Sequence, residues 1–220
     1  MSFPFRLYVI SDRARMGDDP ASAVASLAQV GLRAFHWREK DLTPAETYGR
    51  VAEIARRIDA TGLLRADPCG NAEAPTDRFR LFVNDRADLA LSLCLDLHLT
   101  ESSLPTQAVR GILHPGQLIG RSTHGLEGAR RAESEGADFV TFGPVYDTFS
   151  KRIYGPPAGL ASLREVCSSL TIPVFALGGV NAARVAECRR AGAAGVAVVG
   201  AVWNADDRVQ AVRELLAAAS

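Results

Sequence analysis

The chain has 220 residues, and its 25 Lys and Arg residues balance its 25 Asp and Glu residues to a formal net charge of zero. Apolar residues make up 47% and charged residues 23%, which is typical of a soluble globular protein with a large core. The balance disfavours a general nucleic-acid binder, because neutralising a phosphate backbone needs a basic surplus. We expect no secretory leader and no membrane-spanning helix. Four scattered cysteines without a CxxC pair predict free thiols in a reducing cytoplasm.

Short apolar runs alternate with helical stretches and predict eight parallel strands that are buried on both faces. The runs are Leu7–Ser11, Ala34–Arg38, Leu81–Asn84, Leu95–Leu99, Leu118–Arg121, Phe139–Phe142, Pro173–Leu177 and Gly195–Val199. Helix starts are predicted at Asp19, at the capping box Thr43–Glu46 and at Asn181, and further helices over Ala87–Leu93, Leu126–Glu135 and Ala205–Ala219.

Eight strand-then-helix units predict an α/β fold, the (β/α)8 or TIM barrel, as a single domain over residues 1–220. An open doubly wound sheet is the alternative, and it is weaker because no GxGxxG motif follows the first strand. Residues 63–77 interrupt the pattern with Pro, Gly and Asn, and they predict a surface loop rather than a domain boundary.

The second strand runs into His36-Trp37-Arg38-Glu39-Lys40. Alternation along a strand places His36, Arg38 and, if the strand geometry persists, Lys40 on one face. Active sites of such barrels lie at the carboxyl ends of the strands. An imidazole and two cations there favour an anionic ligand such as a mono- or diphosphate, because the guanidinium fork of Arg matches phosphate. A solvated rim or a salt bridge is the alternative.

The third strand ends in Asn84 and Asp85. Amide and carboxylate oxygens suit Mg²⁺, which often takes one or two protein oxygens together with phosphate and water. Both side chains reach one site only if the chain turns between them. The alternative is that Asp85 caps the helix over Ala87–Leu93.

Two later strand ends carry phosphate-binding signals. A long loop follows the sixth strand, and its Thr148, Ser150 and Lys151 form a plausible phosphate clamp; a solvated loop is the alternative. The seventh and eighth strands end in Gly178-Gly179 and Val199-Gly200. Glycines let backbone N–H groups approach an anion, and barrel phosphate sites are frequently built after these two strands.

Three histidines and a serine remain. Ser122 and His124 follow the fifth strand, where His124 is either a general acid/base or a helix-start residue. His98 lies within a strand and is predicted to be a packed barrel residue. His114 precedes a proline and is predicted to lie in an exposed loop.

Six segments in chain order resemble the thiamine-phosphate synthase family and its close relative, the TenI-type thiazole tautomerases, over roughly Leu7 to Val202. The segments are Leu-Tyr-Val-Ile-Ser-Asp at 7–12, His-Trp-Arg-Glu-Lys at 36–40, Val-Asn-Asp-Arg-Ala-Asp at 83–88, Gly-Arg-Ser-Thr-His at 120–124, Gly-Pro-Val-Tyr at 143–146 and Leu-Gly-Gly-Val at 177–180. The resemblance implies joining an aminopyrimidine methyl diphosphate to a thiazole phosphate with release of pyrophosphate.

The resemblance also implies roles for individual residues. The diphosphate substrate would contact Arg38, Lys40, Asn84, Ser122 and Lys151, with His36 in the same substrate site. Asp85 would bind Mg²⁺. The thiazole phosphate would contact Thr148, Ser150, Gly178, Gly179, Val199 and Gly200. Catalysis would rest on Arg38, Lys40, Lys151 and His124.

Three positions depart from the synthase pattern: His36 replaces a Gln, Ser103 replaces a second Mg²⁺-binding Asp, and Gly200 replaces a Ser. Glu101 is a candidate substitute for the missing carboxylate. The departures leave a thiazole tautomerase, with His124 as its acid/base, and a non-catalytic thiazole phosphate binder as alternatives. The partners expected are small molecules, and whether the chain forms a homo-oligomer is left open.

Overall fold

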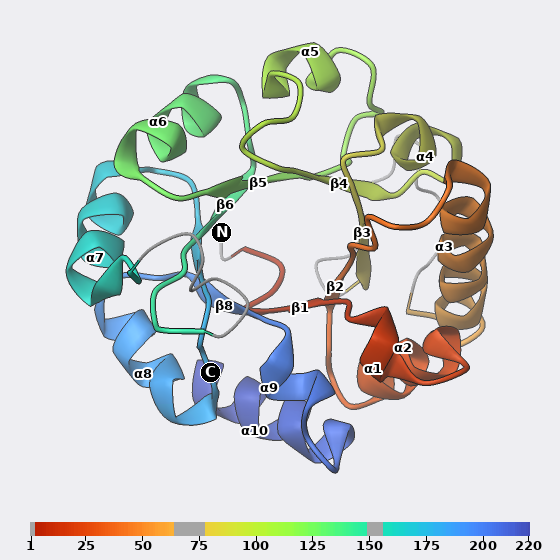
Figure 1. Cartoon of the computed structure of the whole chain (residues 1–220). Helices are drawn as coiled ribbons and strands as arrows, with labels where there is room; N and C mark the ends of the chain where they lie inside the picture. The colour runs from red at the N-terminus through yellow and green to blue at the C-terminus, as the bar shows by residue number, and fades with distance from the viewer. Residues whose placement is uncertain (1–2, 64–77, 149–155) are drawn as a thin grey trace.

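The computed structural model is described here for residues 3–63, 78–148 and 156–220. Eight parallel strands pair in chain order, and the last pairs with the first to close a barrel (Figure 1). The strands are β1 Leu7–Ile10, β2 Ala34–Trp37, β3 Arg80–Asn84, β4 Asp96–Leu99, β5 Ile119–Thr123, β6 Phe139–Phe142, β7 Val174–Leu177 and β8 Gly195–Val198. The predicted barrel is therefore confirmed, and the open doubly wound sheet is excluded.

Helices form a ring around the barrel (Figure 1). They are α1 Arg13–Met16, α2 Pro20–Gln29, α3 Pro44–Asp59, α4 Ala87–Ser92, α5 Thr106–Arg110, α6 Leu126–Ser134, α7 Gly159–Ser169, α8 Ala182–Arg190, α9 Gly200–Trp203 and α10 Arg208–Ala219. Asp19 and Asn181 cap α2 and α8, and Thr43 and Glu46 form the predicted capping box of α3. The last helix begins at Arg208 rather than Ala205, because the side chain of Asp207 caps it.

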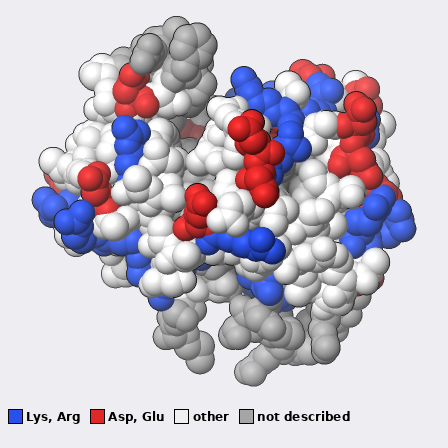
Figure 2. Space-filling view, turned by 90° about the horizontal axis from the view of Figure 1, so that it is seen from below, with Lys and Arg blue, Asp and Glu red and all other residues white. Residues whose placement is uncertain are grey.

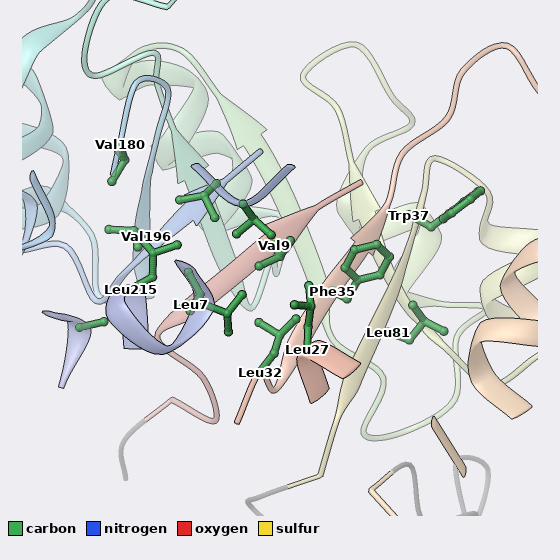
Figure 3. Packing of buried hydrophobic residues seen from close by; sticks show 14 of the residues in the cluster. Leu7, Val9, Leu27, Leu32, Phe35, Trp37, Leu81, Val180, Val196 and Leu215 are labelled. Atoms are coloured by element: carbon green, nitrogen blue, oxygen red, sulfur yellow. The ribbon is translucent and has the colours of Figure 1, made fainter. Parts of the chain in front are cut away.

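Strand residues alternate between two hydrophobic layers, which explains why the strands are apolar throughout. One layer lies between the sheet and the helices, where Figure 3 shows Leu7 and Val9 of β1 with Phe35 of β2 and Leu27 of α2. The other layer fills the barrel with inward-facing side chains. Its buried members include Tyr8, Phe82, Phe139 and Phe175.

The segment before β1 closes the amino-terminal end of the barrel. Phe5 is buried, and its ring lies 5.1 to 5.9 Å from the rings of Phe82, Phe139 and Phe175. Phe3 packs beside it, with ring centroids 4.9 Å apart. The described segment before β1 accordingly lies inside the ring of strands in Figure 1. Among the described residues, the carboxyl ends of the strands form the end that is not filled by these rings.

The predicted surface loop lies outside the described residues except for Leu63. Cys94 is disulfide-bonded, so the expectation of four free thiols is wrong; Cys167 and Cys188 are free. Among the described helices, none is both long and apolar enough to cross a bilayer. Basic and acidic side chains are interspersed over the face drawn in Figure 2, without a continuous patch of one sign.

Candidate active site

His36 forms part of the floor of the site, inside the barrel. The ring is buried, stacks on Tyr8 at 5.6 Å with a 10° tilt, and lies 4.4 Å from the ring of His98. Neither ring nitrogen of His36 has a hydrogen-bond partner among the described residues. Burial lowers the pKa of His36 well below its ordinary value, with further lowering by His98 and Arg38, whereas Asn84 raises it. The imidazole is therefore neutral, with polar atoms available to a ligand.

Arg38 and Lys40 extend beyond the end of β2, and both are exposed. The adjacent carboxylate does not neutralise them, because Glu39 accepts hydrogen bonds from the Ser11 hydroxyl at 2.5 Å and from the Arg13 amide at 3.1 Å. Within the described ranges, neither cation forms an ion pair. Among those residues the salt-bridge alternative is not observed, and both charges at the barrel mouth are available to a ligand.

Asn84 and Asp85 reach one cavity because the chain turns between them. Asp85 has a φ of 54°, and its amide donates to the carbonyl of His98 at 2.9 Å. The alternative role for Asp85 is wrong, since Arg86 is the N-cap of α4 and no side chain caps that helix. A cavity of about 280 Å³ is lined by Trp37, Glu39, Lys40, Leu42, Thr47, Asn84, Asp85, Arg86, Thr100 and Ser102. This cavity brings the predicted cation and carboxylate together.

The loop after β4 adds no carboxylate to Asp85. The Ser103 hydroxyl accepts the Thr100 amide proton at 2.8 Å, so it turns back into its own loop. A Cβ placed on Gly128 of α6 would lie 2.5 Å from Oε1 of Glu101, which locates that carboxylate against α6. The described residues contain no group of three or more His, Cys, Asp or Glu side chains able to hold a metal ion. A metal here would need oxygens from a ligand as well.

Ser122 and His124 lie at the carboxyl end of β5, one within the strand and one just after it. The Ser122 hydroxyl contacts Nε2 of His98 at 3.0 Å. His124 is exposed, and its Nδ1 lies 2.6 Å from the carbonyl oxygen of Gly143. A carbonyl can only accept, so Nδ1 of His124 carries the proton and Nε2 presents a lone pair to solvent or substrate.

Three successive carbonyl groups fix the backbone after β7. The carbonyls of Leu177 and Gly178 accept the amide protons of Val145 and Tyr146 at 2.8 and 3.0 Å. The carbonyl of Gly179 accepts Nη1 of Arg184 at 2.6 Å. In a planar trans peptide the N–H points opposite to the C=O. The amides that follow each carbonyl therefore point away from these partners, as an anion-binding turn requires.

The two glycines of this turn are required by space and conformation. Their φ angles are 95° and 66°, and a Cβ would lie 2.6 Å from Pro144 at Gly178 and 2.7 Å from Tyr146 at Gly179. After β8, Val199 precedes α9, which begins at Gly200. Thr148 is half-buried, whereas the predicted Ser150 and Lys151 lie outside the described residues.

Two inward-facing residues that the sequence did not assign to the site lie next to it. Tyr8 is fully buried and its hydroxyl lies 3.1 Å from Nδ1 of His98. His98 is a packed barrel residue, as predicted, but it is hydrogen-bonded at both ring nitrogens. The signal available in the sequence is strand alternation, which places both side chains on the barrel-facing side of β1 and β4.

Comparison with known proteins identifies the family. The model of the family "Thiamine monophosphate synthase" matches residues 69–202. A thiamine-phosphate synthase from Anaeromyxobacter dehalogenans is 42% identical over 96% of this chain and 86% of its own, and one from Roseiflexus sp. is 36% identical over 95% and 83%. The solved thiamine phosphate pyrophosphorylase from Pyrococcus furiosus superimposes with a TM-score of 0.80 at 28% identity, covering 99% of this chain and 96% of that one. The chain belongs to the thiamine monophosphate synthase family.

Proposed function

We propose that this chain is a thiamine-phosphate synthase, which joins 4-amino-2-methyl-5-hydroxymethylpyrimidine diphosphate to thiazole phosphate and releases pyrophosphate. The observation that carries the proposal is the juxtaposition of Lys40, Asn84 and Asp85 in one cavity, beside a mouth where Arg38 is exposed. Because both substrates carry phosphate charges, which cross bilayers poorly, we place the reaction in the cytoplasm.

The diphosphate end of the pyrimidine substrate is assigned to Arg38 and Lys40. As the carbon–oxygen bond breaks, negative charge develops on the leaving diphosphate, and fixed cations at the mouth stabilise that charge more than they stabilise the ground state. The buried Asn84 oxygen is unpaired among the described residues and suits a donor on the same substrate. Ser122 contributes a hydroxyl. Lys151 is assigned to the same substrate from the family pattern alone.

The pyrimidine ring is assigned to the floor of the barrel. The unpaired nitrogens of His36 can each meet a polar atom of the ring edge, so binding satisfies groups whose burial otherwise costs free energy. The neutral state of this imidazole is compatible with the electron-poor methylene centre that forms when diphosphate leaves.

The thiazole phosphate is assigned to the other side of the mouth. The Gly178-Gly179 turn presents backbone amides, and the turn at Val199-Gly200 lies on the neighbouring strand β8. Thr148 of the loop after β6 supplies a hydroxyl, and Ser150 is added from the family pattern. After the C–O bond to diphosphate has broken, the thiazole nitrogen donates its lone pair to the methylene carbon and forms the new C–N bond.

Mg²⁺ is proposed as the metal, and the residues present fit it. Asp85 supplies one hard carboxylate oxygen, which forms no ion pair within the described ranges, beside the unpaired amide oxygen of Asn84. Mg²⁺ is commonly bound by one or two protein oxygens together with substrate phosphates. When bound, the metal supplies positive charge to the diphosphate oxygens.

The assay that tests the proposal supplies both substrates to the purified protein over a range of Mg²⁺ concentrations. We expect Asp85→Asn to raise the Mg²⁺ concentration for half-maximal rate and to lower turnover about 100-fold. Mg²⁺-dependent binding of the pyrimidine diphosphate, measured by calorimetry, gives a second readout. Asp59→Asn is the matched control, since Asp59 is exposed at the carboxyl end of α3 and does not line the cavity. Synthase activity that is unaffected by Mg²⁺ and by Asp85→Asn would overturn the metal assignment.

A further inference from the structure

Ser122 is the upper end of a hydrogen-bonded chain that begins deep in the barrel. The Tyr8 hydroxyl lies 3.1 Å from Nδ1 of His98, and Nε2 of His98 lies 3.0 Å from Oγ of Ser122. Tyr8 and His98 are 0% and 1% exposed. A fully buried chain of this kind has few protonation patterns that leave no group unsatisfied, so its proton positions can be worked out.

The buried phenol decides the tautomer of His98. Nδ1 of His98 is the only hydrogen-bond partner of the Tyr8 hydroxyl among the described residues. If Nδ1 carried the proton, the phenol hydrogen would be buried without an acceptor. Tyr8 therefore donates, and Nδ1 accepts. A ring that accepts at Nδ1 carries no proton there, so the imidazole is neutral and its single proton is on Nε2.

The direction of the next bond follows. Nε2–H of His98 donates to Ser122, and the Thr141 hydroxyl also donates to Ser122 at 3.4 Å. Ser122 thus accepts from two neighbours, and its own O–H must donate elsewhere. Ser122 is partly exposed at the carboxyl end of β5, so the outlet for this hydrogen is the mouth of the site.

The fold makes room for this chain at a specific position. Gly120 lies two residues before Ser122 on the same face of β5. A Cβ at Gly120 would lie 2.7 Å from Nδ1 of His98 and 2.3 Å from the Phe139 ring. A side chain at position 120 would overlap the imidazole of His98. The buried ring can therefore occupy this position only because residue 120 is a glycine.

We propose that Tyr8 and His98 are positioning residues for the synthase reaction, because they hold Ser122 as an obligate hydrogen-bond donor toward an acceptor atom of the pyrimidine diphosphate. The inference rests on the proposed assignment of Ser122 to that substrate. Neither Tyr8 nor His98 needs to touch the reacting atoms. Their effect reaches the substrate through the orientation of one hydroxyl hydrogen.

The test is a double-mutant cycle on kcat/KM for the pyrimidine diphosphate. We expect Tyr8→Phe and His98→Leu each to lower kcat/KM about tenfold, and His98→Gln to retain most of it, because the glutamine amide can still donate to Ser122. In the Ser122→Ala background, Tyr8→Phe should have little further effect. Calorimetric affinity for thiazole phosphate should stay within about twofold, and Tyr48→Phe on α3 serves as the exposed tyrosine control.

Each outcome bears on a separate claim. If Ser122→Ala retains the parent kinetics, the assignment of Ser122 to the substrate fails, and the positioning role fails with it. If Ser122→Ala is impaired but Tyr8→Phe lowers kcat/KM equally in both backgrounds, only the positioning role is overturned. Should His98→Leu not fold, as judged by circular dichroism, the cycle between Tyr8→Phe and Ser122→Ala decides the question.

Discussion

The role of His124 distinguishes the two reactions that the family resemblance implies, the synthase reaction and the tautomerisation of a thiazole. Its Nδ1–H is held by the carbonyl of Gly143, which leaves Nε2 as a base on an exposed ring. Loss of diphosphate and capture by the thiazole nitrogen require no proton transfer in the step that breaks the C–O bond. Tautomerisation of a thiazole, in contrast, consists of proton transfer, and an acid/base group contributes about 10²–10⁴-fold to such a step.

We therefore expect His124→Gln to lower synthase turnover by less than about tenfold, which is below the range for acid/base catalysis. The measurement is the steady-state rate with both synthase substrates, beside an assay with the carboxylated thiazole tautomer. Binding of thiazole phosphate should be retained. Complete loss of synthase turnover with binding intact would contradict the secondary role assigned to this residue.

The buried imidazoles of His36 and His98 also predict how stability depends on pH. Their folded-state pKa values are lowered, that of His98 to about 3, whereas an unfolded histidine titrates near 6.5. Below pH 6.5 the unfolded chain binds protons that the folded chain does not. Stability therefore falls as the pH falls, by up to about 1.4 kcal/mol per pH unit for each histidine.

Urea unfolding at pH 7.5, 6 and 5 checks this expectation. His98→Gln should unfold more easily at pH 7.5 but lose less stability between pH 7.5 and 5 than the parent. Tyr8, whose hydroxyl contacts Nδ1 of His98, stays neutral across this range because burial raises its pKa. His114→Gln is the control, because His114 is a partly exposed histidine in the loop before β5. If the free energy of unfolding falls equally with pH in His98→Gln and in the parent, His98 is not the source of the pH dependence.

At the scale of elements, the first turn of α8 braces the turn after β7. Arg184 donates to the carbonyl of Gly179 at 2.6 Å, and its guanidinium lies 4.4 Å from the centroid of the Tyr146 ring. Tyr146 is held in turn by Glu187, one helical turn further along α8, at 2.7 Å. The amide that follows Gly179 is fixed by this contact rather than by the strand.

Removing the brace should loosen the phosphate-binding turn without touching the diphosphate site. We expect Arg184→Met to raise the KM for thiazole phosphate about tenfold, the scale of one charge-assisted hydrogen bond, with kcat/KM for the pyrimidine diphosphate little changed. Arg184→Lys should recover part of the loss. The surface variant Arg190→Met, on the same helix, is the control. An unchanged KM in Arg184→Met would mean that the glycines hold this backbone unaided.

Local signals in the sequence predicted the elements better than they predicted the contacts between them. The bounds of β6 are those expected from its apolar run, and the cap at Asn181 is confirmed, because both depend on neighbouring residues. No range was predicted for α1, α5, α7 or α9; three of these have only four or five residues, which are too few to show helical periodicity. The contact of Arg184 with Tyr146 joins residues 38 positions apart along the chain, and no local pattern encodes it.

In the site, too, local patterns predicted the positions of some residues, whereas other positions depend on contacts between elements. Strand alternation sufficed to place His36 inside the barrel and Arg38 at its mouth. The turn that separates Asn84 from Asp85 depends on a positive φ and on a hydrogen bond to β4, which a strand pattern does not specify. The orientation of Glu101 toward α6 likewise follows from packing between two elements.

At the scale of the whole molecule, the two ends of the barrel treat charge differently. Two ion pairs lie at the amino-terminal ends of the strands: Arg80 with the buried Asp96 at 3.1 Å, and Arg110 of α5 with Asp138, which precedes β6. Both carboxylates also accept backbone amides at the start of β5, from Leu118 to Asp96 and from Ile119 to Asp138. Ion pairs also occur beyond the carboxyl ends, where Arg13 pairs with Asp41 and Arg86 with Asp88. Arg38, Lys40 and Asp85, in contrast, form no ion pair among the residues that the structure describes, so these charges are available to a substrate.

The phenylalanines before β1 close the amino-terminal end of the barrel, so in the described structure a ligand reaches the interior from the carboxyl ends of the strands. The pyrimidine ring is assigned to the floor beside His36, and the thiazole phosphate to the turn at Gly178 and Gly179. We therefore predict that the pyrimidine diphosphate binds first, that thiazole phosphate binds second, and that thiamine phosphate leaves last. Thiamine phosphate should then inhibit competitively against the diphosphate and non-competitively against thiazole phosphate, and initial-rate product inhibition measures this. Competition against both substrates would indicate that the substrates bind in random order.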